Sequence, residues 1–514
     1  MTLHFPDPVF ANESDYAAMR DLFRASHFTR KDIPIALGIP TVESFRQFPR
    51  PTMAAMTAGG RPIDAFARLF LMHEPIPTGQ ASKAVAPMSL DSWLKAGILR
   101  QEGDNVFPNM GIAFFDDLWL LHDTRMEVGN TYVMGVAGTT AALANQSIFA
   151  PGSLALDLGT GCGVLAFLAA KNCKRVLATD KNPRAIAVAR FNAKLNNLSN
   201  VDFAMGDLYE PVHSYLAKQP TPTRFDFIYC NPPFVIAPSP TYMYRDSGMV
   251  GDAIVEAVAR GAGPLLNEGG IAQLVCNWMH VGEQPWQDRL KSWFHGSGCD
   301  ALIFQTRAMG PLDYASIWIE ETEKSATPEA RWKMLNEWMA AYQQMQLKGV
   351  SFGLFTLRKR TNRANFVSFD DAPENLVSPA GPHIAEMLAC RDYLAALDAT
   401  GNADEVLANA NLWFSPHLRV DQHLRPAANT PGSSWKHERD DIRLAHGYGF
   451  GKVIDQRHMD VLMALDGSRS VNHVVETIAA TTKAPASALL PLIVRLCRGW
   501  LERAYVLPPG YPRG

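Results

Sequence analysis

Glycines at alternate positions form the first pattern in this 514-residue chain that could take part in chemistry. The four residues of this loop that we single out are Gly159, Thr160, Gly161 and Gly163. They follow a short apolar run that ends near Asp157, and glycine there allows a tight turn and a close approach of a ligand to the backbone. The helix expected behind the loop offers free N–H groups. A dinucleotide-binding loop would carry a third glycine at the sixth position, where Val164 stands, so the pattern disfavours that ligand.

Two acidic residues stand where neighbouring strands should end. Asp180 follows the apolar run 175–179, and Asp207 follows the run 201–205. Taken singly, each could be a solvated loop residue. In a doubly wound sheet, however, the carboxyl ends of the strands meet at the ligand crevice, and an acid after the second strand can accept both ribose hydroxyls of a nucleoside. We expect Asp180 to bind the ribose and Asp207 to accept a hydrogen bond from the adenine amino group.

The most specific pattern is Asn231-Pro232-Pro233-Phe234, which follows the strand expected at 225–229. Residues 153–235 resemble the class I S-adenosylmethionine-dependent methyltransferases of the Asn-Pro-Pro-aromatic branch. That branch includes enzymes that methylate exocyclic amino groups of nucleobases and the release factor glutamine methyltransferases. The Val-Ile-Ala-Pro that follows the motif resembles the glutamine enzymes. The resemblance implies S-adenosyl-L-methionine as cofactor, held by Asp157, Gly159, Thr160, Gly161, Gly163, Asp180, Asp207 and Asn231.

The motif also has a physical logic for methylation of a planar nitrogen. The lone pair of an amide or aromatic amine is delocalised, so attack needs acceptors that hold both N–H groups and favour a pyramidal nitrogen. The Asn231 side-chain oxygen and the Pro232 carbonyl could be those acceptors, preorganised by two rigid prolines. Phe234 could stack on the planar target. We expect Asn231, Pro232 and Phe234 to be catalytic, and Pro233, Tyr244 and Arg245 to line the substrate pocket.

The predicted function is methyl transfer to an amide or amino nitrogen of a macromolecule, with protein glutamine slightly preferred. An exocyclic amino group of an RNA or DNA base is the near alternative, followed by a small molecule. A scaffold protein that keeps the fold without catalysis is the alternative from another class. The stretch 132–140 is either a plain loop or a segment that closes over the methionine end of the cofactor. This scheme needs no metal, and the fourteen histidines show none of the short spacings typical of metal sites.

Short apolar strands alternate with helices across residues 126–362, which predicts an α/β domain with a seven-stranded Rossmann-like methyltransferase sheet. A polar stretch at about 313–346 should be a helical insertion. Residues 1–125 predict an N-terminal helical or winged-helix-like domain, and 363–514 a C-terminal domain with a winged-helix-like end. A winged helix can bind nucleic acid or protein, so this outline leaves the choice between a protein and an RNA substrate undecided.

The composition of the chain limits its expected binding partners and cellular location. With a formal net charge of −3, the chain lacks the overall positive charge that is typical of many nucleic-acid-binding proteins. The seven cysteines form no Cys-x-x-Cys pair, which favours reduced thiols in a reducing compartment. The chain starts without the pattern of a signal peptide, and no apolar run reaches the roughly 18 residues that span a bilayer. We therefore expect a cytoplasmic protein that does not bind membranes.

Overall fold

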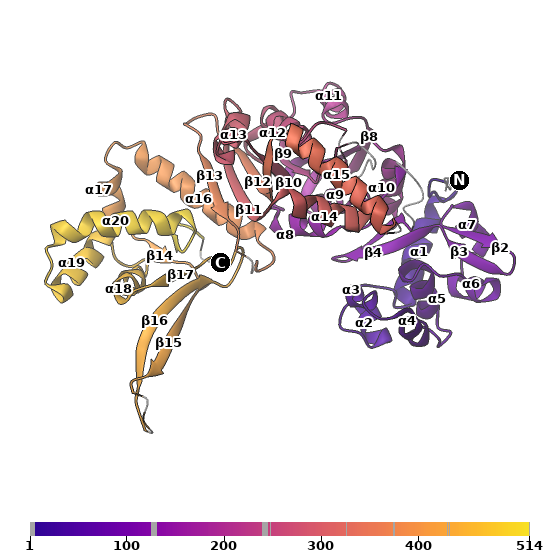
Figure 1. Cartoon of the computed structure of the whole chain (residues 1–514), viewed down its shortest axis with the longest axis horizontal. Helices are drawn as coiled ribbons and strands as arrows, with labels where there is room; N and C mark the ends of the chain where they lie inside the picture. Colours follow the sequence, from indigo (N-terminus) through magenta and orange to yellow (C-terminus); the bar gives the residue numbers. More distant parts are fainter. Residues whose placement is uncertain are drawn as a thin grey trace. The chain divides into compact units, whose positions relative to one another are not determined.

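The computed structural model describes residues 6–124, 131–238, 245–246, 248–324, 326–373, 376–428, 430 and 432–512. The chain splits into two compact units (Figure 1), of which the first comprises Met1–Ala144 with Phe149–Asp371 and the second Asn145–Ile148 with Ala372–Gly514. The N-terminal and central regions of the sequence thus share one unit. Within the described ranges, no helix combines the length and the apolar character that crossing a bilayer requires.

The centre of the first unit is a mostly parallel sheet with the order β13-β11-β12-β10-β9-β6-β7-β8. Its strands are β6 (Gly152–Leu158), β7 (Cys173–Asp180), β8 (Val201–Met205), β9 (Phe225–Cys230), β10 (Leu266–Val281), β11 (Cys299–Met309), β12 (Leu347–Lys359) and β13 (Val367–Asp371). Strand β12 runs antiparallel to both neighbours, whereas the remaining pairs are parallel. The α/β prediction is therefore correct. Among the described residues the sheet has eight strands rather than seven, because the half-buried, polar β13 adds to its edge beside β11.

Seven helices of the described chain connect these strands: α9 (Val164–Ala170), α10 (Pro183–Leu195), α11 (Glu210–Leu216), α12 (Ala253–Leu265), α13 (Trp286–Phe294), α14 (Pro311–Thr322) and α15 (Pro328–Gln344). The last two form the expected insertion and pack on each other and on β12 (Figure 1). Buried apolar residues of the strands and of α12 make one core, in which Trp278 is fully enclosed. Helices on a sheet with its apolar faces covered are the usual solution for parallel strands.

The N-terminal region consists of short helices and two small antiparallel sheets. The helices are α1 (Glu13–Ala25), α2 (Asp32–Leu37), α3 (Val42–Phe45), α4 (Arg50–Met56), α5 (Pro62–Phe66), η1 (Ala67–Leu71), α6 (Thr78–Val85) and α7 (Leu90–Lys95). The strands are β1 (Ile76–Pro77), β2 (Leu99–Glu102), β3 (Asn105–Pro108), β4 (Met110–Phe115) and β5 (Leu118–Asp123), paired as β1-β3-β2 and β4-β5. Aromatic rings such as Phe23, Phe66 and Trp93 fill the space between them. The winged-helix likeness of this region stays a prediction.

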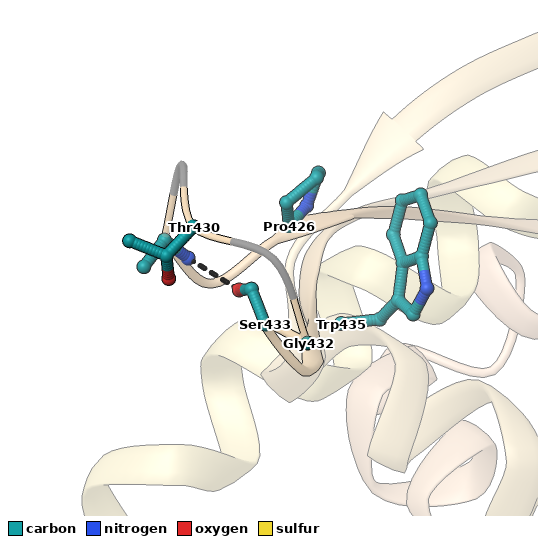
Figure 2. Close-up of a pocket in the computed structure, with 6 residues that line it drawn as sticks. Pro426, Thr430, Gly432, Ser433 and Trp435 are labelled. Carbon is teal, nitrogen blue, oxygen red and sulfur yellow. Dashed lines mark hydrogen bonds between the residues drawn. The ribbon is translucent and has the colours of Figure 1, made fainter.

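The second unit combines helices with a long β-hairpin. Its helices are α16 (Gly381–Asp398), α17 (Ala403–Ala408), α18 (Gln456–Ala464), α19 (Val471–Thr482) and α20 (Ala486–Glu502), while α8 (Gly138–Gln146) crosses the boundary between units. The expected extended end is β18 (Val506–Leu507), which pairs with the distant β14 (Trp413–Phe414). Strands β15 (Leu418–Pro426), β16 (Trp435–Leu444) and β17 (Gly451–Ile454) form the remaining sheet. Figure 2 shows the hairpin tip, where Ser433 Oγ accepts a hydrogen bond from the Ala428 N–H and Pro426 and Trp435 line a shallow hollow.

A buried ion pair joins the N-terminal region to the central sheet. Arg184, in the first turn of α10, donates from Nε and Nη2 to the carboxylate of Asp123 at the end of β5. Its Nη1 donates to the carbonyl oxygen of Pro6, and Asp123 Oδ2 also accepts from the N–H of Val133. Both charged side chains are almost completely enclosed. Each charge is thereby compensated by its partner and by further hydrogen bonds, which buried charges require.

We expect Asp123→Ala to lower the free energy of unfolding by about 3–5 kcal/mol, because it removes the buried counter-charge of the Arg184 guanidinium, whose other acidic partner, Asp7, is exposed. Chemical denaturation followed by circular dichroism measures this change. The control is Lys291→Ala, which breaks an ion pair with Asp288 whose side chains are 54% and 53% exposed. Such a surface pair contributes less than about 1 kcal/mol. Equal losses in the two variants would contradict the assigned role of the buried pair.

Candidate cofactor and substrate site

The glycine loop between β6 and α9 has the conformation that its composition predicts. Gly159, Gly161 and Gly163 all lie in the left-handed region, with φ of 80°, 55° and 102°. A side chain at Gly163 would overlap the ring of Phe167, whereas one at Gly159 or Gly161 would meet no atom within 4 Å. The Thr179 carbonyl oxygen accepts from the N–H groups of Gly159 and Thr160 and holds the loop to β7. The first two glycines therefore border open space, as a ligand seat requires.

Asp157 supports this loop from the end of β6. Its Oδ2 accepts from Thr160 Oγ1 (2.7 Å) and from the N–H of Ala166 (3.0 Å). Its other oxygen, Oδ1, is buried and has no hydrogen-bond partner among the described residues. Burial raises the pKa of the Asp157 carboxyl to about 7, although its hydrogen bonds act in the opposite direction. The buried Oδ1 of Asp157 therefore lacks the donor that buried acceptors normally have.

Asp180 ends β7 and is bonded on both carboxylate oxygens. Oδ2 accepts from the Gly161 N–H (2.9 Å) and Oδ1 from the Asn182 N–H (2.8 Å). Burial raises the pKa of this carboxyl, and the two backbone hydrogen bonds lower it. A carboxylate oxygen has a second lone pair, so Asp180 can still accept from hydroxyl groups. It therefore fixes the glycine loop and keeps acceptor capacity for a ribose.

Asp207 lies in a more exposed position after β8. Its side chain is 56% exposed, and its Oδ2 pairs with Lys181 Nζ at 2.7 Å. A surface ion pair of this kind is worth little and rearranges easily. The predicted contact with an adenine amino group therefore requires no buried bond to be broken, and it stays a prediction.

Asn231 follows β9, and threonines of α8 hold its side chain. The Asn231 Nδ2 group donates to Thr139 Oγ1 (3.2 Å) and to Thr140 Oγ1 (2.9 Å). Both donors of the amide are thereby used, so its oxygen is the end that can accept from a further group. The stretch 132–140, which the sequence leaves open as a plain loop or a cofactor cover, thus supplies the partners of Asn231. The Gly-Thr-Thr start of α8 was the only sequence signal for them.

The rest of the Asn-Pro-Pro-Phe loop is held by the helical insertion. The Ile236 N–H donates to the Tyr314 hydroxyl of α14 (3.1 Å), and its carbonyl accepts from the Tyr342 hydroxyl of α15 (2.8 Å). Asn277 Nδ2 also donates to the Tyr314 hydroxyl. Burial raises the pKa of both phenols above its ordinary value, so both stay neutral. Sequence reasoning missed these two tyrosines, because nothing local links them to the loop.

Pro232 is buried in this loop, and Pro233 is half-buried. Phe234 is only 6% exposed, belongs to the main hydrophobic core and forms a β-bridge with Asp246. Most of its ring is therefore engaged in packing, which leaves little of it for the expected stacking on a target group. The proposed contact of Phe234 with substrate stays a prediction, and packing of the loop is the role that its burial supports.

Arg245 differs from the expectation that it lines the substrate pocket. Its guanidinium is buried, makes two hydrogen bonds to the Asp246 carboxylate (2.6 and 2.8 Å) and a third to Thr322 Oγ1 of α14 (3.0 Å). Its carbonyl accepts from the Val235 N–H. Arg245 thus joins the loop to the insertion. The sequence does not predict this contact, because Thr322 lies 77 residues further along the chain. Tyr244, the other tentative pocket residue, lies outside the described residues.

Comparison with known proteins matches residues 138–296 to the methyltransferase small domain and residues 25–109 to a domain of unknown function. A protein of Methanocaldococcus jannaschii, provisionally assigned as a protein glutamine methyltransferase, is 30% identical over 26% of this chain and 67% of its own length. The release factor glutamine methyltransferase of Xylella fastidiosa is 32% identical over 24% of this chain and 46% of its own. Phosphoethanolamine N-methyltransferase 2 of Haemonchus contortus, solved with S-adenosyl-L-methionine, aligns with 43% of this chain and 52% of its own at 14% identity and a TM-score of 0.27.

We expect Asp180→Ala to weaken binding of S-adenosylmethionine and S-adenosylhomocysteine about 10- to 150-fold. The change removes a charged acceptor, and hydrogen bonds to charged groups contribute about 1.5–3 kcal/mol. Isothermal titration calorimetry measures both dissociation constants. Asp202→Ala is the control, because Asp202 lies in β8 and binds Arg175 and Tyr215 instead of the glycine loop. A folded Asp180→Ala protein with unchanged affinity would place the ribose acceptor elsewhere.

Proposed function

Because this chain belongs to the class I S-adenosylmethionine-dependent methyltransferases, we propose that it methylates a planar amide or amino nitrogen of a macromolecule, and a protein glutamine in particular. The observation that carries the proposal is the side chain of Asn231, whose amide nitrogen is held by Thr139 and Thr140 so that its oxygen can accept from a target N–H. The names of the two relatives support glutamine as the target. The chain spans about two thirds of the first relative and about half of the second, so the substrate is our inference.

The residues of the chain act by holding and orienting the target. When bound, S-adenosylmethionine supplies a methyl group already activated by its sulfonium. The Asn231 side-chain oxygen and the Pro232 carbonyl accept from the two N–H groups of the target nitrogen. Positive charge develops on that nitrogen as the new bond forms, and fixed acceptors stabilise it without reorganising. Correct positioning of the reactants can lower the activation barrier by about 7–11 kcal/mol. After the transfer, the methylated nitrogen releases its extra proton to water.

The cofactor is assigned to the open side of the glycine loop. Gly159, Thr160, Gly161 and Gly163 would pass close to it, Asp157 Oδ1 would face its ammonium group, and Asp180 would accept from its ribose. Asp207 would bind the adenine amino group. Two observations support this arrangement. Gly159 and Gly161 have free space beside their α-carbons, and the buried Oδ1 of Asp157 has no hydrogen-bond partner among the described residues.

The parts of the chain outside the methyltransferase domain are proposed to recognise the substrate. The alignments with the two relatives cover only about a quarter of this chain, and residues 1–125 and 363–514 lie outside the predicted methyltransferase domain. The winged-helix-like outline at each end would suit binding to a protein or an RNA. All seven cysteines are buried and unpaired, which supports the cytoplasm as the location.

We expect Asn231→Ala to lower the rate of methyl transfer about 100- to 1000-fold while cofactor affinity stays nearly unchanged. Losing one preorganised hydrogen-bonding group typically has an effect of that size. Asn231→Asp keeps an acceptor oxygen and should retain part of the activity. Turnover, melting temperature and the dissociation constant of S-adenosylmethionine are measured on each variant. An Asn231→Ala protein that is folded, binds cofactor and turns over at the wild-type rate would contradict nitrogen methylation.

The substrate class can be determined directly. We expect that incubation with S-adenosylmethionine carrying a tritiated methyl group and a cell extract will label macromolecules, and that protease rather than nuclease will release the label. Acid hydrolysis of the labelled protein should then give methylamine, the product expected from a methylated glutamine amide. Release by nuclease alone would favour a nucleobase amino group, and label confined to small molecules would exclude both macromolecular substrates.

A further inference from the structure

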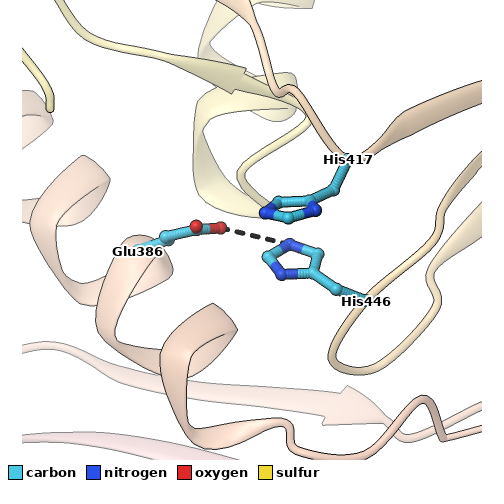
Figure 3. A group of neighbouring side chains, drawn as sticks. All are labelled: Glu386, His417 and His446. Carbon is cyan, nitrogen blue, oxygen red and sulfur yellow. Dashed lines mark ion pairs between the residues drawn. The ribbon is translucent and has the colours of Figure 1, made fainter. Parts of the chain in front are cut away.

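The second unit contains a cluster of side chains that the proposed methyl transfer does not use. Glu386 lies on α16, His417 directly precedes β15, and His446 follows β16 (Figure 3). Each offers one potential ligand atom, and these atoms all lie within 4.8 Å of one another. All three residues are half-buried. No residue assigned to the cofactor belongs to this unit.

The contact between Glu386 and His446 is not an ordinary hydrogen bond. Glu386 Oε2 and His446 Nε2 are 3.2 Å apart, yet neither atom has a hydrogen-bond partner in the part of the chain that the structure describes, and both atoms are buried. Ligands bound at about 2.0–2.2 Å around a tetrahedral Zn²⁺ lie about 3.3–3.6 Å from one another. The two atoms thus have nearly the spacing of ligands that share a metal ion, and each lacks the partner that buried polar atoms normally have.

The two imidazoles of the cluster lie face to face. The rings of His417 and His446 stack with centroids 3.8 Å apart and planes 20° apart. Two protonated rings at this distance would repel each other strongly. A metal ion binds an imidazole through a nitrogen with a free lone pair, and the buried Nε2 of His446 has no hydrogen-bond partner among the described residues.

Main-chain contacts hold the cluster in place. The Ala445 N–H donates to the His417 carbonyl (2.8 Å), so the two histidines are fixed across the base of the hairpin. Gly447 has a φ of 63°, and a side chain there would overlap His383 of α16. The ring of His383 is itself occupied, because Nδ1 accepts from the Tyr448 N–H (3.2 Å) and Nε2 donates to the Arg503 carbonyl (3.1 Å). His383 therefore orients the turn that carries His446 and leaves the three other side chains as the ligand set.

We propose that Glu386, His417 and His446 bind one Zn²⁺ ion that joins α16 to the base of the β15–β16 hairpin. Two histidines and one carboxylate are an established ligand set for zinc, with water in the fourth position. The ligands come from three segments that only the fold brings together, so binding adds to the stability of that fold. The ligands are 31 and 29 residues apart in the chain, which explains why the search for short histidine spacings predicted no metal.

The test uses the full chain after treatment with a chelator and dialysis. Calorimetric titration with ZnCl₂ should show one ion per chain, and zinc should raise the melting temperature. His417→Ala, His446→Ala and Glu386→Gln should each weaken zinc binding at least about tenfold. The matched control is His458→Ala, since His458 is exposed and pairs with Asp455, three residues earlier, away from the cluster. Its zinc affinity should equal that of the wild type.

Cobalt gives an independent measure that does not depend on the variants folding. Co²⁺ bound to the wild-type protein in place of Zn²⁺ should show the intense visible absorption of a tetrahedral site, and zinc should displace it. Absence of saturable zinc binding in the wild type, or equal zinc affinity in the wild type and all three folded ligand variants, would overturn the proposal. The cluster would then be a Glu–His ion pair with a stacked imidazole. Methyl transfer by the zinc-free protein is a separate measurement, so failure of either proposal leaves the other intact.

Discussion

Two hydrogen bonds from the Asn231 amide nitrogen to threonine hydroxyls fix the side chain on which the proposed methyl transfer depends. An asparagine that rotates freely presents a donor as often as an acceptor, and a target N–H group can use only the acceptor. By engaging Nδ2, Thr139 and Thr140 give the side chain one orientation before any substrate arrives. A polar group that is already oriented needs no reorganisation when charge develops on the target. The start of α8, about ninety residues earlier in the chain, is therefore part of the machinery of the Asn-Pro-Pro-Phe loop.

Asp157 and Asp180 each bind more than one group of the glycine loop and its flanking elements. Asp157 binds Thr160 and the backbone of α9, and Asp180 binds the backbone of Gly161. Each carboxylate thus stabilises the glycine loop and can still accept a further hydrogen bond. Burial raises the pKa of both carboxyls, which is the cost of placing them where they reach the loop. Hydrogen bonds from N–H and O–H groups offset part of that cost, because they favour the charged form.

The sequence predicted the parts of this structure that are encoded locally. The apolar runs predicted the strands of the parallel core, whose carboxyl ends carry Asp157 in β6 and Asp180 in β7, and Asn231 directly after β9. It did not reveal contacts with distant partners. Arg245, expected to line a pocket, donates to Thr322 of α14 as well as to the adjacent Asp246, and Phe234 is largely enclosed in the core. The sequence did not predict strand β13, because an edge strand needs few apolar residues and the polar composition of this segment is typical of a linker.

Helices α14 and α15 of the insertion have a structural role that neither their sequence nor their polarity predicts. Tyr314 and Tyr342 bind both main-chain groups of Ile236, and Arg245 reaches Thr322 from the same loop. Prolines can stiffen a loop only within the few residues whose φ they fix, and Pro232 and Pro233 leave the chain after them free to turn. The insertion restrains the chain there, while α8 restrains it at Asn231. Acceptors held from both ends can stay aligned with a target nitrogen to within the small tolerance that efficient transfer demands. The helical insertion is for this reason better understood as a support of the Asn-Pro-Pro-Phe loop, which we propose holds the target, than as an addition to a finished domain.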